Sequence, residues 1–230
     1  MDKKMPTYAE TVAEITREHL KENNGVALGQ CLTAVGWVGG TVPQIIKGLI
    51  ELSMADVSGG YIACGYAREG RRPIYIVRYQ GFQWFNAPGY LNYAAKAKEM
   101  WGTPCPMFVR SIAMDGGIGP VASGSHHGIA TRVPGIKVCA PMTPLEYHLV
   151  WSRFMQDDDP YYVSEHRKSF TINYEMADLL CPHSDVVLFP ISSTRLNAIE
   201  AEVRLSREGV RCGINHLLWL KPFVVSEGMR

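Results

Sequence analysis

The sequence has no excess of charge of either sign. Its 230 residues contain 23 Lys plus Arg against 22 Asp plus Glu, which gives a formal net charge of +1. Binding to nucleic acid or to an anionic membrane needs a concentrated positive field, so this balance argues against both partners. No apolar run reaches the ~18 residues of a membrane-spanning helix, and the start MDKKMPTYAE has no apolar segment typical of a signal peptide. We therefore expect a cytoplasmic protein.

The spacings of common metal, redox and nucleotide sites are missing as well. Six cysteines are spread almost evenly, and no two have ligand or redox-pair spacing. Such cysteines are typical of buried free thiols in a reducing compartment. There is no Gly-x-Gly-x-x-Gly or Gly-x-x-x-x-Gly-Lys-Ser/Thr motif. The loop 115–120 matches a phosphate cradle only in its glycine content, so a plain surface loop is favoured for it.

What the sequence does contain is an alternation of strands and helices. Apolar residues at helical intervals predict a helix over 8–23 that is opened by Thr7, with Glu10 in its first turn. Three further helices are expected, and they alternate with five short strands. The expected helices are 59–69, from about Pro88 to 100, and 144–155; the strands are 26–28, 74–77, 106–112, 136–140 and 161–163. The segment 31–42 is glycine-rich and is expected to be irregular.

This alternation predicts an α/β protein with a mostly parallel sheet flanked by helices. We assign residues 1–169 to the first domain and 170–183 to a linker. Residues 184–230 are then the start of a second α/β domain, with strands 185–189 and 210–214 around a helix at 195–208. The chain is expected to end before that second domain is complete.

Two polar features are candidates for chemistry. Asp56 stands ahead of a run of small residues, where local rules make it a helix cap. His126 and His127 follow a glycine-rich loop, from which one imidazole can project into a pocket as a proton donor or oxyanion partner. A metal site is not expected there, because no carboxylate or third histidine recurs at a ligand interval. Purely structural roles for all three residues remain open.

An aromatic cluster follows the second predicted buried strand. Residues 79–85 hold four aromatic side chains: Tyr79, Phe82, Trp84 and Phe85. Aromatic residues usually belong to the core. A run this dense just after a strand can instead stack against a flat heterocycle.

Taken in order, these segments resemble the pyrimidine-binding half of thiamine diphosphate enzymes. The resemblance is strongest to the β subunit of the first component of 2-oxo acid dehydrogenase complexes, with transketolase and deoxyxylulose-phosphate synthase more distant. Each motif is weak alone, but their order and spacing extend from about residue 7 to residue 222. The matching segments are 7–10 (TYAE), 27–30 (ALGQ), 56–67, 70–74 (GRRPI), 82–96, Arg110, 116–117, 126–127, 134–138 (PGIKV), Pro141, 157–160 (DDDP), 165–166 and 185–189 (DVVLF).

The resemblance implies roles for individual residues. The family's activating glutamate, which hydrogen-bonds a ring nitrogen of the aminopyrimidine, aligns with Asp56. Phe82 is expected to stack on the pyrimidine, with Tyr79 or Phe85 as alternatives. Gln30 falls near the cofactor, and His126 or His127 near the substrate.

The resemblance also implies that this chain supplies only half of a site. The family holds the diphosphate and its Mg²⁺ with a Gly-Asp-Gly motif followed by Asn, and this sequence has no such motif. An α-type partner subunit would carry it, in an α₂β₂-like assembly in which the β chains also dimerise. A lipoyl-bearing acyltransferase is a further expected partner. Transketolase-like two-carbon transfer is the alternative activity.

Three departures from the family favour another alternative, a non-catalytic or regulatory subunit. Asp56 is shorter than glutamate by one methylene, roughly 1.5 Å, and a charge-assisted hydrogen bond is sensitive to that distance. Either the backbone lies further inward, a water bridges the gap, or activation is weak. Gln30 replaces an acidic residue, and the chain ends part-way through the family's C-terminal domain.

Overall fold

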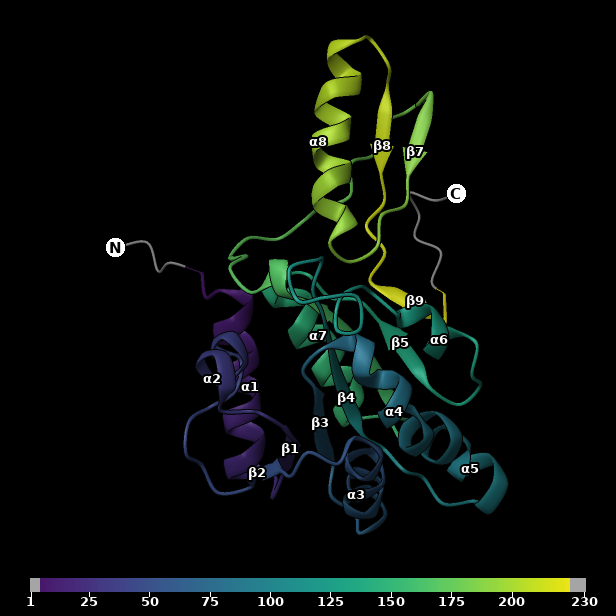
Figure 1. Cartoon of the computed structure of the whole chain (residues 1–230). Coiled ribbons are helices and arrows are strands. Elements are labelled where there is room, and N and C mark those ends of the chain that lie inside the picture. Colours follow the sequence, from purple (N-terminus) through teal and green to yellow (C-terminus); the bar gives the residue numbers. More distant parts are fainter. Residues whose placement is uncertain (1–4, 224–230) are drawn as a thin grey trace.

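The main body is a seven-stranded sheet in the order β2-β1-β3-β4-β6-β5-β9 (Figure 1). This computed structural model describes residues 5–223. Neighbouring strands are parallel except β5 and β9, so the predicted mostly parallel α/β fold is confirmed. The strands are β1 (Val26–Gln30), β2 (Leu49–Leu52), β3 (Pro73–Val77), β4 (Phe108–Ala113), β5 (Lys137–Cys139), β6 (Tyr161–His166) and β9 (Trp219–Lys221).

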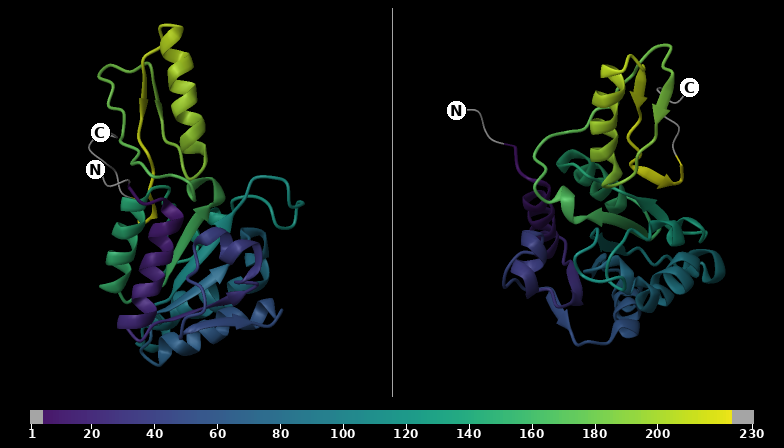
Figure 2. Two further views of the ribbon diagram at one scale, coloured as in Figure 1. Left: turned by 90° about the vertical axis from the view of Figure 1, so that its left-hand side faces the viewer. Right: turned by 45° about the horizontal axis from the view of Figure 1, so that its top comes forward.

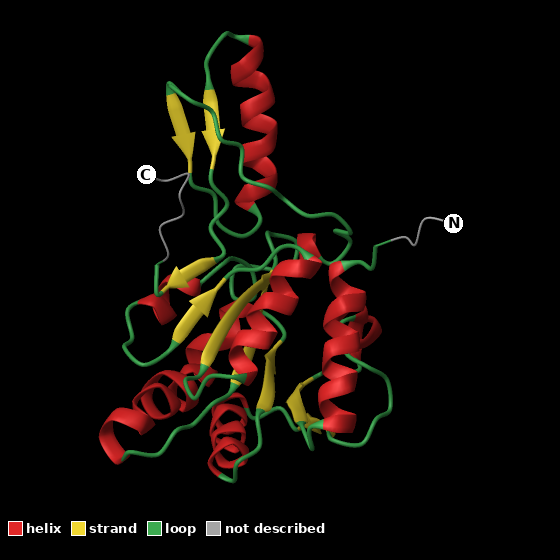
Figure 3. Cartoon of the chain, turned by 180° about the vertical axis from the view of Figure 1, so that it is seen from behind, coloured by secondary structure: helices red, strands yellow, loops and turns green. Residues whose placement is uncertain are grey.

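Helices cover both faces of this sheet (Figure 3). On one face α1 (Tyr8–Glu22) and α7 (Pro144–Met155) pack on a core that includes Ile74 and Ile76 of β3. On the other face α3 (Asp56–Arg68) packs on Tyr75 and Val77 of the same strand. Successive side chains of a strand point to opposite faces, which explains why the apolar stretch of β3 is buried throughout. None of the helices within 5–223 is both long and apolar enough to cross a membrane.

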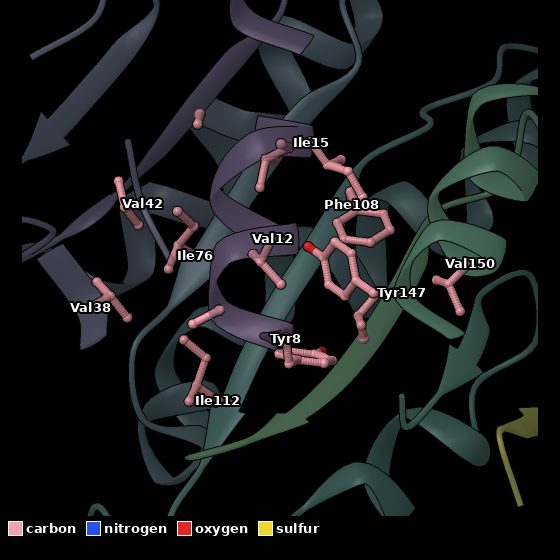
Figure 4. Close-up of a cluster of buried hydrophobic side chains, with 14 of the residues drawn as sticks. Tyr8, Val12, Ile15, Val38, Val42, Ile76, Phe108, Ile112, Tyr147 and Val150 are labelled. Atoms are coloured by element: carbon pink, nitrogen blue, oxygen red, sulfur yellow. The ribbon is translucent and has the colours of Figure 1, made fainter. Parts of the chain in front are cut away.

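The first core is rich in aromatic rings (Figure 4). Tyr147 of α7 meets Tyr8 of α1 edge-on, with ring centroids 5.3 Å apart, and meets Phe108 of β4 at 5.9 Å. The start of α1 follows from local sequence as expected. The Thr7 hydroxyl accepts a hydrogen bond from the Glu10 backbone N–H at 3.2 Å, and the Glu10 carboxylate accepts one from the Thr7 N–H at 2.7 Å.

The helical segment after β3 starts earlier than the sequence suggests. It runs without a break through η1 (Gln80–Phe82), α4 (Gln83–Ala87), the π-helical turn η2 (Pro88–Ala94) and α5 (Ala95–Trp101). The predicted start near Pro88 is therefore wrong. Proline inside an α-helix clashes with the carbonyl four residues earlier. Here the wider π-helical turn begins at the proline. Such a turn accommodates the break that proline makes in the series of α-helical backbone hydrogen bonds.

Two further elements near β1 were not predicted. The expected irregular segment contains a short helix, α2 (Ala34–Gly40), in which Val35 to Gly39 all have φ between 52° and 64°. This is a left-handed turn, which costs an L-residue about 1–2 kcal/mol. β2 is only four residues long and half-buried, so it lacks the apolar run by which the other strands are recognised.

A smaller unit projects from one end of the main body (Figure 2). In it β7 (Val186–Leu188) pairs in parallel with β8 (Cys212–Ile214), and α8 (Thr194–Arg207) connects them. Between η3 (Arg167–Ser169) and β7 the chain has no helix or named strand. β9 then returns to the main sheet, where Val138 of β5 faces Lys221. The division into domains at 170–183 stays a prediction, and residues 224–230 of the expected second domain lie outside the described part.

Close backbone contact joins α3 to the π turn. A Cβ atom added at Gly89 would lie 2.5 Å from the carbonyl carbon of Gly60, and one added at Gly60 would lie 2.8 Å from the carbonyl oxygen of Asn86. Only glycine at both positions allows the two helices to approach this closely.

We expect Gly89→Ala to destabilise the protein by about 1–3 kcal/mol, because backbone atoms cannot yield as a flexible side chain can. Gly65→Ala is the matched control: Gly65 is exposed on the same helix α3, and an added Cβ would meet nothing within 4 Å. That substitution should stabilise by about 0.5–1 kcal/mol. Urea unfolding of the three proteins measures both effects, and equal midpoints for the two variants would contradict the packing argument.

Candidate active site

The site lies where two neighbouring parallel strands send the chain in opposite directions. The chain leaving β1 enters α2, whose Val38 joins the core under α1 and α7. The chain leaving β3 enters the helical segment 80–101, whose Tyr90 and Leu91 join the opposite core. In open α/β sheets a crevice forms at the carboxyl ends of such strands.

A cavity of about 230 Å³ occupies this position. Pockets for whole small-molecule ligands usually measure about 300–1,000 Å³, so this one has room for a single ring system rather than an extended cofactor. It is lined by Gln30, Cys31, Met54, Asp56, Tyr75, Ile76, Val77, Arg78, Tyr79, Phe82 and Asn86.

Four of the five residues predicted to bind the cofactor line the cavity together. They are Gln30 at the end of β1, Asp56 at the start of α3, and Tyr79 and Phe82 after β3. The fifth, Phe85, lies one turn further along, with its side chain 51% exposed. It shares a shallower surface pocket with Asp56.

Asp56 is the first residue of α3, not its cap. The N-cap is Ala55, and no side chain caps the helix. The positive end of the helix dipole favours a carboxylate at this position. Within the described residues, the Asp56 carboxylate has no hydrogen-bond or ion-pair partner, although it lines the cavity. Burial, together with the nearby Asp56 carboxylate, raises the pKa of Tyr75.

Another part of the cavity wall is aromatic, and hydrogen bonds hold it in place. The rings of Tyr79 and Phe82 lie with centroids 6.3 Å apart, inclined at 53°. The Asn86 side chain donates from Nδ2 to the Phe82 carbonyl at 2.9 Å and accepts at Oδ1 from the Tyr75 hydroxyl. A carboxylate and an aromatic face on one small cavity fit a flat heterocycle that presents a hydrogen-bonding edge.

The predicted histidines do not line this cavity. His126 precedes α6 (His127–Thr131), and its ring lies edge-on to Trp84, with centroids 6.2 Å apart. The ring nitrogen Nδ1 of His127 lies 3.2 Å from the Ser164 hydroxyl. Burial, and in second place the neighbouring His126, lower the pKa of His127. His127 is therefore neutral at pH 7.

A buried polar network holds the histidine loop, and sequence reasoning missed it. The Gln80 side chain accepts at Oε1 from the His126 N–H at 2.6 Å, and donates at 2.8 Å to both the Ser111 carbonyl and the Ser164 hydroxyl. Gln83 donates to the His126 carbonyl at 3.1 Å. It also accepts from the Tyr162 hydroxyl, which lies 2.9 Å from Ser111 Oγ. Glutamines inside an aromatic segment give no periodic signal, and their partners come from distant strands.

Among residues 5–223, no three His, Cys, Asp or Glu side chains lie close enough together to hold a metal ion.

Comparison with known proteins identifies the family. The family described as "Transketolase, pyrimidine binding domain" matches residues 48–172, more than half of the chain. The chain belongs to this family. The matched range contains the cavity wall from Met54 to Asn86 and the histidine loop.

Individual relatives point to β-type subunits. The chain is 26% identical over 201 residues to the β subunit of an acetoin:2,6-dichlorophenolindophenol oxidoreductase from Bacillus subtilis (strain 168), covering 76% of this chain and 58% of that protein. It is 23% identical to the β subunit of the pyruvate dehydrogenase E1 component of the same organism, covering 94% and 73%. A split-gene transketolase solved as an inactive β4 tetramer has the same fold, with a TM-score of 0.70, 14% identity, and coverage of 95% and 73%. The chain thus spans less than two thirds of the acetoin relative.

We expect Gln83→Met to destabilise the protein by about 1–3 kcal/mol, because the Tyr162 hydroxyl and the His126 carbonyl each lose a partner in a buried setting. The histidine loop should also be cleaved faster by a protease. Gln156→Met is the matched control at an exposed helix end, and it should change stability by less than about 0.5 kcal/mol. Urea unfolding and limited proteolysis provide the two measurements. Unchanged cleavage within 115–128 would show that Gln83 does not hold this loop.

Proposed function

We propose that the chain is a β-type subunit of a thiamine diphosphate-dependent enzyme acting on a 2-oxo acid, and that its β1/β3 cavity binds the cofactor's aminopyrimidine ring. The observation that carries this proposal is the unpartnered Asp56 carboxylate facing the same small cavity as Phe82 and Tyr79. Family membership and the resemblance to β-type subunits support it. When bound, thiamine diphosphate supplies a carbon that attacks a carbonyl and then stabilises negative charge beside it.

Each residue of the cavity has a part in this proposal. Phe82, fixed through Asn86, offers its face to the ring. Asp56 makes a charge-assisted hydrogen bond to a ring nitrogen, and this bond is stronger in a cavity that excludes water. Gln30 offers both a donor and an acceptor. The histidine loop, held by Gln80 and Gln83, supplies candidate proton donors.

The close approach of α3 to the sheet is the feature by which we propose that the shorter Asp56 side chain reaches the ring. A Cβ added at Gly59 would lie 2.6 Å from the Tyr75 hydroxyl, and Gly60 contacts the backbone at Asn86. These glycines draw the first turn of α3 toward the cavity. Their contacts favour the backbone lying further inward over a bridging water.

A partner subunit would complete the site. Apolar side chains on and around α3 and α4 remain uncovered beside Asp56, and such exposed patches mark interaction surfaces. They are Met54, Val57, Tyr61, Ile62, Trp84 and Phe85, each more than 40% exposed. We infer that an α-type subunit covers them and brings the diphosphate and Mg²⁺ site. β–β dimerisation, a lipoyl-bearing acyltransferase partner and a cytoplasmic location belong to the same proposal, and the six free thiols suit such a compartment.

Two-carbon transfer in the manner of transketolase is the second candidate. The likeness of this fold to a β chain of a split-gene transketolase favours it. A phosphosugar substrate would distinguish it from 2-oxo acid decarboxylation.

We expect the chain to co-purify with a subunit carrying the Gly-Asp-Gly…Asn motif, and the complex to bind thiamine diphosphate. Phe82→Ala should weaken that binding by about 1–3 kcal/mol, the usual contribution of aromatic stacking. Calorimetric titration of the complex measures the affinity. If the complex binds no thiamine diphosphate, the proposed function fails.

Asp56→Asn should slow exchange of the bound cofactor's thiazolium proton by about 10²–10⁴-fold, the range of acid–base contributions. Nuclear magnetic resonance in D₂O follows this exchange without any need for turnover. Asp56→Glu is the sharper variant, because faster exchange would show that the shorter side chain limits activation. Glu208→Gln, exposed at the end of α8, is the matched control and should have no effect. Normal exchange in Asp56→Asn would support the non-catalytic alternative.

A further inference from the structure

Two consecutive hydrogen bonds connect β3 to the residue that carries the Phe82 ring. The Tyr75 hydroxyl donates to Oδ1 of Asn86, and the Asn86 amide donates from Nδ2 to the Phe82 carbonyl at 2.9 Å. All three residues line the cavity. Tyr75 and Asn86 are only 2% and 3% exposed, so both hydrogen bonds are shielded from competing water. The strand and the aromatic part of the cavity wall are therefore joined through the Asn86 side chain.

The direction of both hydrogen bonds is fixed. A backbone carbonyl can only accept, so the Asn86 amide must turn its NH₂ group toward Phe82 and its oxygen toward Tyr75. Burial, and in second place the Asp56 carboxylate, raise the pKa of Tyr75. The phenol therefore keeps its proton and remains a donor. The two partners of Asn86 favour the same orientation of its amide.

The same hydroxyl lies against the helix that begins with Asp56. A Cβ atom added at Gly59 would lie 2.6 Å from the Tyr75 hydroxyl oxygen, so α3 can pass this oxygen only because residue 59 has no side chain. Tyr75 is thus in contact with two parts of the cavity wall. It meets α3 at Gly59 and the aromatic part through Asn86.

Packing alone does not require the Tyr75 hydroxyl. Tyr90 belongs to the same core, with its ring centroid 6.5 Å from that of Tyr75, and its buried hydroxyl has no hydrogen-bond partner within the described residues. A phenylalanine at position 75 would fill the core without needing a buried asparagine beside it or a glycine against it. Supporting hydrogen bonds of this kind are what a binding site needs to keep its contacting side chains in place.

We propose that Tyr75 is a positioning residue, which acts through Asn86 to hold the Phe82 ring in place relative to the first turn of α3. This inference rests on the proposed function for the identity of the bound ring. A bound heterocycle needs the aromatic face and the Asp56 carboxylate at a constant separation, because a charge-assisted hydrogen bond weakens when its geometry loosens. Without the Tyr75 hydroxyl, Asn86 loses one of its two partners and Phe82 becomes more mobile.

The first test follows the Phe82 ring in the full-length chain without any ligand, by fluorine nuclear magnetic resonance with 4-fluorophenylalanine at position 82. We expect one narrow signal from the natural chain, and a broadened or doubled signal from Tyr75→Phe. Tyr90→Phe is the matched control, because it removes a buried hydroxyl that has no partner; its signal should stay narrow. A narrow signal from Tyr75→Phe would overturn the proposal.

The second test is a double-mutant cycle on thiamine diphosphate binding by the complex, measured by calorimetric titration. Tyr75→Phe should weaken binding about three- to tenfold, the factor that corresponds to one net hydrogen bond. With Phe82→Ala already present, the same substitution should change the affinity by less than about 1.5-fold, because Tyr75 then has no ring to position. A purely structural role predicts equal losses with and without Phe82→Ala. That result, or no loss at all, contradicts the proposal.

Asn86→Leu tests the connecting residue. It should weaken thiamine diphosphate binding at least as much as Tyr75→Phe does, and adding Tyr75→Phe to it should have no further effect. Additive losses in the double variant would show that Tyr75 does not act through Asn86.

The outcome is separable from the proposed function. If the complex binds no thiamine diphosphate but Tyr75→Phe broadens the Phe82 signal, the positioning role stands and the proposed function fails. If thiamine diphosphate binds normally and Tyr75→Phe matches Tyr90→Phe in both tests, the proposed function stands and the positioning role fails.

Discussion

The site depends on one topological constraint, the divergence of the chain at the carboxyl ends of β1 and β3. These strands are hydrogen-bonded neighbours, with Leu28 facing Tyr75, yet the segments that follow them pack on opposite faces of the sheet. A hollow remains between the ends of the two strands. Gln30 and Arg78 reach this hollow because each stands where its strand ends. Asp56 reaches it because α3 starts beside the same edge.

Close packing then gives the hollow its shape. Glycines at 59, 60 and 89 allow α3 and the π turn to approach the sheet and each other, which brings Asp56 to one wall and fixes Asn86 behind Phe82. Deeper in the sheet, Arg110 of β4 makes a bidentate ion pair with Glu165 of β6 at 2.6 and 2.8 Å, both side chains fully buried. Removing one partner of such a pair costs about 3–5 kcal/mol, while replacing both by apolar groups can be neutral. The pair therefore favours this register of the two strands more than it adds stability.

The sequence correctly predicted the features that are determined by interactions between residues close together in the chain. The Thr7–Glu10 cap, the buried strands and the small-residue helix are each specified within a few residues. The start of the helical segment at Gln80 was missed because proline normally begins a helix, and only the π turn allows Pro88 inside one. Gln80 and Gln83 were missed because their partners, Ser111, Ser164 and the histidine loop, are brought to them by the sheet. The gathering of Gln30, Asp56, Tyr79 and Phe82 was expected from a resemblance, since no spacing rule joins residues from three separate strand ends.

The charges around the cavity show why this hollow is more than a packing defect. Asp56 and Arg78 both line it, yet they form no ion pair with each other, and neither has another charged partner among residues 5–223. A fold shaped by stability alone would bring such opposite charges together or leave them in open water. Here the close contacts of Gly59 and Gly60 position the start of α3, where Asp56 stands, and the Tyr79 ring orients the Arg78 guanidinium group. Charged side chains that line one cavity without pairing are found mainly at functional sites. The unpaired Asp56 carboxylate is thus available to a ring nitrogen in a cavity that the aromatic side chains Tyr79 and Phe82 also line.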